Sequence, residues 1–307
     1  MPAVSIIIVS YNVKQLLMQC LESIPKHFPA EFTYEIIVVD NNSTDGSVAA
    51  VKQHFTDIIL IENKFNNGFS GANNQGINKA QGEIIFLLNP DTELTNKTLL
   101  PVLNFISLNK NAIAGPRLLN TDGSFQNSCF RFPGAMQIVL ESLFLNHIIN
   151  IKTYPQDKLQ QQCRVDALSG AALLFSRSLT VNIGKLDENL FWMEDIDFCF
   201  RCFKNNGGCN YFPGAEIMHH SGQSAKKNLN IAIANQVISK IKYLKKNSGI
   251  SGYFVAIIFS YVHILSRIAI FCCFGIFSPL IFTKLKAYLF TFKQINTYLI
   301  KGSLAVA

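Results

Sequence analysis

The sequence predicts an α/β protein with a doubly wound, mainly parallel sheet and a C-terminal apolar helical extension associated with a membrane. Two observations predict this class. Short runs of Ile, Val, Leu and Phe alternate with helix-like segments over the first ninety residues, and a basic, apolar composition takes over toward the C-terminus. A chain of 307 residues has room for one domain of about 200–250 residues and an appendage.

Four strands are expected in the first ninety residues. Each run is nearly continuous in apolar residues, as is typical of parallel strands that are covered on both faces. They read VSIIIVS (4–10), YEIIVVD (34–40), IILIEN (58–63) and EIIFLLN (83–89).

The first interval between strands predicts a helix. Apolar side chains recur at helical spacing from Leu16 to Ile24, and we expect Pro25 and Pro29 to bound this helix.

The next two intervals complete the alternation. The second, STDGSVAAVKQHF, offers Ser43 or Thr44 as an N-cap, and the third, FSGANNQGINKAQG, is expected to end at Gly82. Strands that alternate with helices in this way indicate a parallel, doubly wound sheet.

Polar residues follow all four predicted strands: SYN, DNN, EN and NPD. Asn-Pro-Asp is ordinary turn chemistry. However, ligands of such sheets bind beyond the carboxyl ends of the strands, so four polar ends predict a site there. No G-x-G-x-x-G follows the first strand and no P-loop motif occurs, which disfavours dinucleotide and P-loop folds.

Charge separates the chain into a body and a tail. Of 27 Lys and Arg residues, 11 lie between Lys226 and the C-terminus, a stretch without Asp or Glu, whereas the preceding residues hold 16 basic and 20 acidic groups. A basic tail implies an anionic partner. Because its charges interleave with apolar runs, we expect a membrane surface and no nucleic acid.

Within this tail, residues 253–282 contain a single formal charge, Arg267. An Arg at the bilayer centre costs about 2.5–3.5 kcal/mol on insertion scales. The 14 to 16 apolar residues on each side of it fall short of the ~20 that a span needs. Re-entrant or interfacial helices are therefore expected, and the alternative is an amphipathic hairpin packed on the protein or on a second subunit.

Location and redox state follow from the first residues and the cysteines. MPAVSIIIVSYN lacks a basic start and a cleavage site, so we expect a cytoplasmic protein at the inner face of the cell membrane. Eight irregularly placed cysteines are expected to be reduced and mostly buried.

An ordered series of motifs resembles the inverting glycosyltransferases of family 2, which have the GT-A fold, and especially their rhamnosyltransferase-like branch. The resemblance implies transfer of a sugar from a nucleotide-diphosphate donor, dTDP-rhamnose or a UDP-sugar, to a hydroxyl of a growing cell-surface glycan or polyprenyl-linked acceptor. The motifs span residues 4 to 224: SIIIVSYN, VVDNNSTDGS, NNGFSGANNQGI, FLLNPDTEL, SGAALLFSR, FWMEDIDFCFR and HHSGQS.

For the donor, the resemblance implies that Tyr11 stacks on the nucleotide base and that Asp40 accepts a hydrogen bond from it. An aromatic face and an acceptor at adjacent strand ends also suit a planar base on chemical grounds, although Tyr11 alone could be an amphipathic residue at a core edge. The resemblance also places Asn67, Gly68 and Asn74 near the base, ribose and diphosphate; the alternative is an ordinary loop and helix cap.

For the metal, the resemblance implies that Asp91 is the last Asp of the family's D-x-D motif, with Asn89 in the place of the first. His219 would complete the metal or diphosphate site, and Glu93 would be a supporting or merely exposed residue. Mg²⁺ or Mn²⁺ is expected, since hard cations accept carboxylate oxygens and substrate phosphates.

For catalysis, the segment WMEDIDFCFR supplies three acids. By themselves they read as the first turn of a helix, with Asp197 paired to Arg201. The resemblance instead implies that Asp195 is the catalytic base and Glu194 its partner, with Trp192 beside Phe191 facing the acceptor.

Alternatives remain at the level of the site and of the whole chain. Cys199, Cys202 and Cys209 with His219 could form a zinc site. The chain could also be a catalytically silent sugar-nucleotide-binding subunit or a nucleotidyltransferase. We expect a catalytic domain over residues 1–238 and a membrane-associated region over residues 239–307. An oligomer of this chain is compatible with the sequence. Residues 120–165 receive no role beyond acceptor or lid contacts.

Overall fold

The computed structural model describes residues 1–145, 151–220, 229–274 and 279–301, so the last four residues of the HHSGQS motif lie outside the described residues. The chain forms two compact units. Unit 1 comprises Met1–Phe132, Thr153–Glu188 and Glu194–Ser221, and unit 2 comprises Pro133–Lys152, Asn189–Met193 and Gly222–Ala307.

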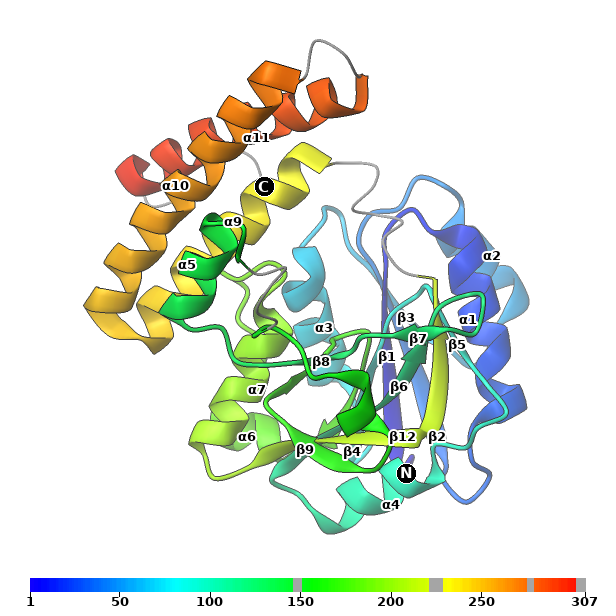
Figure 1. Ribbon diagram of the computed structural model, residues 1–307. Coiled ribbons are helices and arrows are strands. Elements are labelled where there is room, and N and C mark those ends of the chain that lie inside the picture. The colour runs from blue at the N-terminus through cyan, green and yellow to red at the C-terminus, as the bar shows by residue number, and fades with distance from the viewer. Residues whose placement is uncertain (146–150, 221–228, 275–278, 302–307) are drawn as a thin grey trace. The chain divides into compact units, whose positions relative to one another are not determined.

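Unit 1 is built on one large sheet (Figure 1) with the strand order β3-β2-β1-β4-β11-β6-β12-β5. The strands are β1 (Val4–Ser10), β2 (Tyr34–Asp40), β3 (Ile59–Glu62), β4 (Ile84–Leu88), β5 (Thr92–Leu94), β6 (Ala112–Leu119), β7 (Phe125–Gln126), β9 (Cys163–Val165), β11 (Ala172–Ser176) and β12 (Gly208–His219). A separate small pair joins β8 (Cys129–Phe130) to β10 (Ala167–Leu168).

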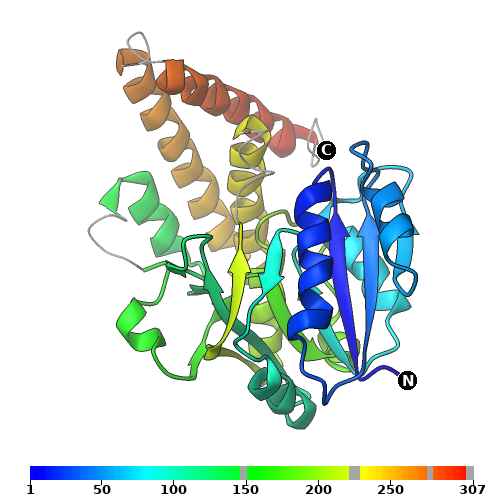
Figure 2. The same ribbon diagram turned by 90° about the vertical axis from the view of Figure 1, so that its right-hand side faces the viewer.

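The four predicted strands are confirmed, and they pair as expected. Strand β1 is parallel to both β2 and β4, and β2 is parallel to β3. Figure 2 shows β1 and β2, in blue, running side by side in one direction. Strand β11 runs antiparallel to β4 and β6, which makes the sheet mixed but mainly parallel.

Successive side chains of each buried strand point to opposite faces of the sheet, and helices cover both faces, so there are two cores. Ile6 and Ile8 belong to the core under α1, α2 and α4, whereas Ile7 belongs to the core under α3, α6 and α7. The helices are α1 (Lys14–His27), α2 (Ser47–His54), α3 (Gly68–Lys79), α4 (Leu100–Leu108), α6 (Leu179–Ile183) and α7 (Glu194–Lys204), with a short 3₁₀ helix at Gln156–Leu159.

The boundaries of α1 and α2 differ from the sequence expectation. Pro25 lies inside α1 instead of bounding it, because a proline in the last turn removes one hydrogen bond while the helix has only two residues left to run. Helix α2 begins at Ser47 after Gly46, so Ser43 and Thr44 are not its cap. The Ser43 hydroxyl instead accepts the backbone N–H of Asn12 at 3.0 Å.

Helix α3 lies very close to β1. A Cβ on Gly76 would come within 2.4 Å of Cγ2 of Ile7, so only glycine allows this approach. The helix ends at Lys79, three residues before the expected Gly82. The N–H of Gly82 instead donates to the hydroxyl of Ser5 at 2.8 Å.

Unit 2 is helical: α5 (Ala135–Ser142), α9 (Leu229–Asn247), α10 (Gly249–Phe274) and α11 (Pro279–Lys301). Helix α10 continues through Arg267 as a single element. Its segment Gly249–Cys273 is long and apolar enough to cross a membrane, which for one helix is weak evidence. Membrane association stays a prediction.

Candidate active site

The carboxyl ends of β1, β2 and β4 meet at one edge of the sheet in unit 1. Ser10 pairs with Asp40, and the N–H of Asn41 donates to the Ser10 carbonyl at 2.8 Å. The N–H of Asn89, after β4, donates to the carbonyl of Ala171 at 2.9 Å. The N–H of Asn63, after β3, donates to the Asp40 carbonyl at 2.9 Å, so backbone pairing holds all four predicted polar strand ends at one edge.

Tyr11 and Asp40 differ in exposure. Tyr11 is 45% exposed, as a stacking surface requires, whereas Asp40 is 2% exposed. Oδ2 of Asp40 accepts the N–H of Ser43 at 2.8 Å, but its buried Oδ1 has no hydrogen-bond partner among the described residues. A buried acceptor without a donor is costly, so this oxygen is suited to a donor that a ligand brings.

The sequence places Asn41 at a polar strand end but assigns it no role of its own, whereas the structure shows that it ties the neighbouring loops together. Its Nδ2 donates to the Gly68 carbonyl at 3.1 Å, and its Oδ1 accepts Nδ2 of Asn63 at 2.9 Å. Its position beside Asp40 was the signal that could have found it. Asn67 lies at the start of α3, and Gly68 has a left-handed φ of 71° with open space where a Cβ would stand.

Asn74 is buried in α3 and is engaged by the chain itself. Its Nδ2 donates to the Leu186 carbonyl and to Oε1 of Glu188, both at 2.9 Å, and its Oδ1 accepts the N–H of Leu186 at 3.1 Å. These contacts hold the 186–188 segment against α3. A contact of Asn74 with the donor stays a prediction.

Asp91 and His219 lie far apart in the sequence and are brought together by strand pairing in unit 1. Strand β12 pairs antiparallel with β5, placing His219 opposite Thr92, and the N–H of His220 donates to the Asp91 carbonyl at 2.8 Å. Nε2 of His219 lies 3.3 Å from Oδ1 of Asp91. Glu93 pairs with Nε2 of His220 at 2.6 Å and so supports the neighbouring residue.

Gln126 fixes the orientation of His219. Its Nε2 donates to the Asn120 side-chain oxygen at 2.9 Å and to the His219 carbonyl at 3.1 Å, so its Oε1 faces Nδ1 of His219 at 2.6 Å. Oε1 can only accept, so Nδ1 carries a proton, and in the neutral ring the lone pair is on Nε2, the nitrogen beside Asp91. Gln126 lies 93 residues from His219, and no sequence signal marked it.

A neutral imidazole nitrogen and a carboxylate oxygen that lie 3.3 Å apart are close enough to bind the same cation. The described residues contain no group of three or more His, Cys, Asp or Glu side chains that could hold a metal ion. Asp91 and His219 would thus supply two ligands, and water and substrate phosphate oxygens would supply the rest, as is usual for Mg²⁺. The residues present fit the predicted divalent ion.

Asp195 lies in the first turn of α7 and is held by two backbone donors. Oδ2 accepts the N–H of Gly170 at 2.8 Å and Oδ1 accepts the N–H of Ile196 at 2.7 Å. A Cβ on Gly170 would lie 3.3 Å from Cβ of Asp195, so a glycine suits this approach. Burial raises the pKa of the Asp195 carboxyl, and the backbone donors oppose it.

The other acids of this helix have different surroundings. Glu194 is buried at the start of α7. Oδ2 of Asp197 accepts Nε of Arg201 at 2.7 Å, which confirms the predicted i,i+4 pair. Trp192 belongs to unit 2, is 44% exposed and has a left-handed φ of 73°.

The three cysteines of the alternative zinc site belong to the core. Cys199, Cys202 and Cys209 are buried among apolar residues such as Phe198, while His219 faces Asp91. They act as small apolar side chains, as expected for reduced buried cysteines.

Comparison with known sequences gives one family. Residues 5–180 match the family described as Glycosyl transferase family 2. The chain is 29% identical over 238 residues, 71% of its own length and 76% of the relative's, to the N-acetylglucosaminyl-diphospho-decaprenol L-rhamnosyltransferase of Mycobacterium tuberculosis. It is 28% identical over 209 residues, 66% and 62% of the two chains, to the low-salt glycan biosynthesis hexosyltransferase Agl10 of Haloferax volcanii.

Solved structures give the fold. The mannosyltransferase PcManGT from Pyrobaculum calidifontis, solved with GDP-Man and Mn²⁺, superposes with a TM-score of 0.57 at 17% identity over 97% of this chain and 87% of that one. GalNAc-T7, solved with UDP, GalNAc and Mn²⁺, gives 0.56 at 16% over 81% and 51%. At these identities the likeness shows the fold alone, which is of the GT-A type.

Proposed function

Because the chain belongs to glycosyl transferase family 2 and is a glycosyltransferase of glycan or polymer biosynthesis, we propose that it transfers a sugar with inversion from a nucleotide-diphosphate donor to a hydroxyl acceptor. The proposed donor is dTDP-rhamnose or a UDP-sugar, in keeping with the rhamnosyltransferase relative. The acceptor is a growing cell-surface glycan or a polyprenyl-linked saccharide.

The surroundings of Asp195 support its role as the base. In the proposed reaction its carboxylate takes the proton of the acceptor hydroxyl while that oxygen attacks the anomeric carbon. The bond to the diphosphate oxygen breaks and the diphosphate leaves with the electron pair. Two backbone donors orient the carboxylate, and a pKa raised by burial makes it a better base.

The donor would lie along the ends of β1, β2 and β4. Tyr11 offers its exposed ring to the base, the unpaired Oδ1 of Asp40 accepts a base N–H, and Asn67 and Gly68 border the ribose and diphosphate. Asp91 and His219 would hold Mg²⁺ or Mn²⁺, which when bound neutralises charge on a diphosphate. Mn²⁺ accompanies the nucleotide in two structural relatives.

The proposed acceptor and the basic tail are both consistent with a location at the membrane surface. The mycobacterial relative is named for a diphospho-decaprenol acceptor, which is a membrane lipid by its chemistry. A basic tail with an apolar helix would keep the catalytic unit at the inner face of the membrane that carries such an acceptor.

The observation that carries the proposal is the Asp195 carboxylate held by Gly170 at the sheet edge that also bears Asp91 and His219. We would test it with a panel of nucleotide sugars and lipid-linked acceptors, with Mn²⁺ or Mg²⁺ against EDTA. General-base help is worth about 10²–10⁴ in rate, so Asp195→Asn should lower turnover by that factor.

Asp197→Asn is the matched control, since it makes the same chemical change two residues away in the pair with Arg201. It should lower stability but leave turnover per folded molecule unchanged. Turnover that survives in Asp195→Asn, or that persists without a divalent ion, would overturn the assigned roles. Binding without turnover on any donor and acceptor would favour a silent subunit.

A further inference from the structure

Unit 2 has an extreme charge composition. Its only acidic side chain is Glu141, whereas it contains Lys152 and the eleven basic residues of the tail. The surroundings of this single carboxylate show where positive charge is concentrated in unit 2.

Glu141, at the end of α5, is the centre of a cationic cluster. Lys152 lies 2.7 Å from its Oε1 and Lys240 of α9 lies 2.6 Å from its Oε2. Arg267 of α10 donates to the Glu141 backbone carbonyl at 3.0 Å. Two cations thus contact the carboxylate and a third binds the backbone of the same residue, and the Glu141 side chain is only 8% exposed.

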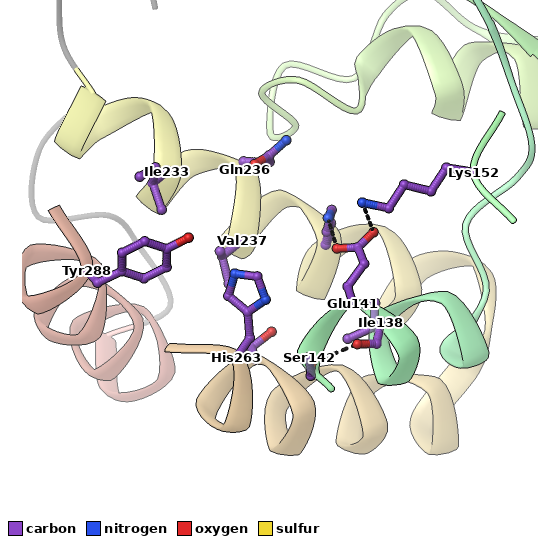
Figure 3. A pocket seen from close by; sticks show the side chains of 11 residues that line it. Ile138, Glu141, Ser142, Lys152, Ile233, Gln236, Val237, His263 and Tyr288 are labelled. Atoms are coloured by element: carbon purple, nitrogen blue, oxygen red, sulfur yellow. Dashed lines mark hydrogen bonds and ion pairs between the residues drawn. The ribbon is translucent and has the colours of Figure 1, made fainter. Parts of the chain in front are cut away.

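A cavity of about 170 Å³ opens on this cluster, lined by Glu141, Lys152, Lys240, Ser142, Ser260, Gln236, His263, Tyr288 and three aliphatic residues. Figure 3 shows Glu141 reaching toward Lys152, with His263 and Tyr288 on the other side of the cavity. The volume is below the ~300–1,000 Å³ of pockets for drug-sized ligands. A compact polar group fits it better.

The charge balance of the cavity favours an anion. Burial alone would raise the pKa of Glu141, but Lys240 and Lys152 hold it at about 2, so this carboxylate is fully ionised. Burial lowers the pKa of Lys240 against the pull of Glu141, and Lys152 and Arg267 lower it further. One internal carboxylate therefore leaves an excess of positive charge, which costs free energy in a poorly solvated site.

The outer surface of α10 indicates where such an anion comes from. Large apolar side chains recur at helical spacing along one exposed stripe: Ile250, Phe254, Ile258, Val262 and Leu265. Ser260 and His263 lie between these positions and line the cavity, and Arg267 turns back to α5. An apolar outer stripe on a helix whose polar groups face inward is what contact with acyl chains requires.

We propose that the cavity between α5, α9, α10 and α11 binds the phosphate group of a membrane lipid, with Lys152 and Lys240 as its cationic ligands and the exposed stripe of α10 against the acyl chains. A phosphate brings the negative charge that the cluster lacks and accepts from several donors at once. The inference rests on unit 2 alone and stands apart from the chemistry proposed for unit 1.

The test uses the full chain in a nonionic detergent and measures binding of inorganic phosphate and diphosphate by calorimetry. Lys152→Gln should weaken binding about tenfold, and Glu141→Gln should tighten it about tenfold, because it removes the one competing negative charge. Opposite changes in phosphate affinity indicate a binding site. In a purely internal ion-pair network, both substitutions would only lower the stability of the fold. Lys284→Gln/Lys293→Gln, at exposed positions of α11 outside the cavity, should leave the phosphate affinity unchanged.

A second arm identifies the source of the phosphate. The protein is mixed with phosphatidylcholine vesicles with and without phosphatidic acid, and inorganic diphosphate is added as competitor. Preference for phosphatidic acid that Lys152→Gln reduces supports the lipid. Phosphate binding with no vesicle preference overturns the lipid source. Phosphate affinity that ignores both Lys152→Gln and Glu141→Gln overturns the site, and thermal unfolding of each variant shows whether it has folded.

Discussion

For Asp195, the protonation state that burial favours differs from the one that the proposed reaction needs. Burial raises the pKa of its carboxyl above the ordinary 3.8, so folding shifts this group toward its protonated form. Such a group contributes stability that is present at low pH and is lost as the pH rises through its folded pKa. The proposed reaction needs the ionised form, which is the one that burial disfavours.

Transfer activity should therefore have an acid limb displaced above that of an ordinary Asp. As the pH falls through the raised pKa of Asp195, the base becomes protonated and kcat/KM should fall tenfold per pH unit. The measurement is a pH profile of kcat/KM. The residual activity of Asp195→Asn should lack this limb, whereas Asp197→Asn should retain it; the same limb in Asp195→Asn would assign it to another group.

Gln126 should control metal affinity through His219. Gln126→Leu removes the acceptor at 2.6 Å from Nδ1 of His219, so the ring loses its fixed tautomer and orientation. Outer-shell partners of metal-ligating histidines are typically worth about 10–100-fold in affinity. Mn²⁺ titration followed by electron paramagnetic resonance measures this directly, without turnover.

The control for this substitution is Gln156→Leu, an exposed glutamine of the same unit. It should leave Mn²⁺ affinity unchanged. Equal Mn²⁺ affinity in Gln126→Leu and the native chain would show that Gln126 supports the strand end and not the metal ligand.

At the scale of elements, Asn74 joins α3 to the 186–188 segment. Asn74→Ala removes three hydrogen bonds in a buried position and strands the Leu186 N–H and carbonyl. Leaving buried polar groups unsatisfied costs about 1–3 kcal/mol, so urea unfolding should show a loss of that size.

Asn78→Ala, one turn further along α3, is the comparison for this loss. Its exposed side chain accepts a hydrogen bond from the ammonium group of Lys185, an exposed contact, so the substitution should change stability by less than about 0.5 kcal/mol. An Asn74→Ala variant that is as stable as the native chain but binds the donor poorly would reverse the reading and favour the predicted contact with the donor.

The elements that the sequence predicted best are those with a strong local pattern. The four strands from β1 to β4 were recognisable because their apolar runs are continuous and each ends in polar residues. The cap of α2 was not, because Ser43 has a distant alternative, the N–H of Asn12. A helix cap is decided by which donor lies nearest in space, and the sequence does not give that distance.

The candidate site also contains residues that a local sequence pattern indicates and residues that it does not. Asp91 and Asp195 stand in recognisable motifs, whereas Gln126 and Gly170 act through residues that lie 93 and 25 positions away. Their contacts depend on the pairing of β6 with both β7 and β12 and on the approach of α7 to the turn before β11. Gln126 stands outside the motif series, and Gly170 stands inside SGAALLFSR without a role that the sequence could assign, because neither contact has a local signature.

At the scale of the whole molecule, charge is segregated along the chain. The residues before Lys226 hold 16 basic and 20 acidic groups, and the tail holds 11 basic groups and no acidic one. A basic segment beside an apolar helix should bind anionic membranes by two additive contributions. Coulombic attraction to lipid charge is screened by salt, whereas burial of apolar surface is not.

The affinity of the full chain for phosphatidylserine-containing vesicles should therefore fall as salt rises from about 0.01 to 1 M, over which the Debye length shrinks from ~30 to ~3 Å. It should level off at the value set by the apolar stripe of α10. Each Lys near an anionic surface contributes about 1 kcal/mol, so Lys284→Gln/Lys293→Gln should weaken low-salt binding by about thirtyfold and the high-salt plateau hardly at all. Vesicle sedimentation across the salt series measures both parts. Binding that does not change with salt would assign the membrane contact to apolar burial alone and would leave the basic tail without its expected anionic partner.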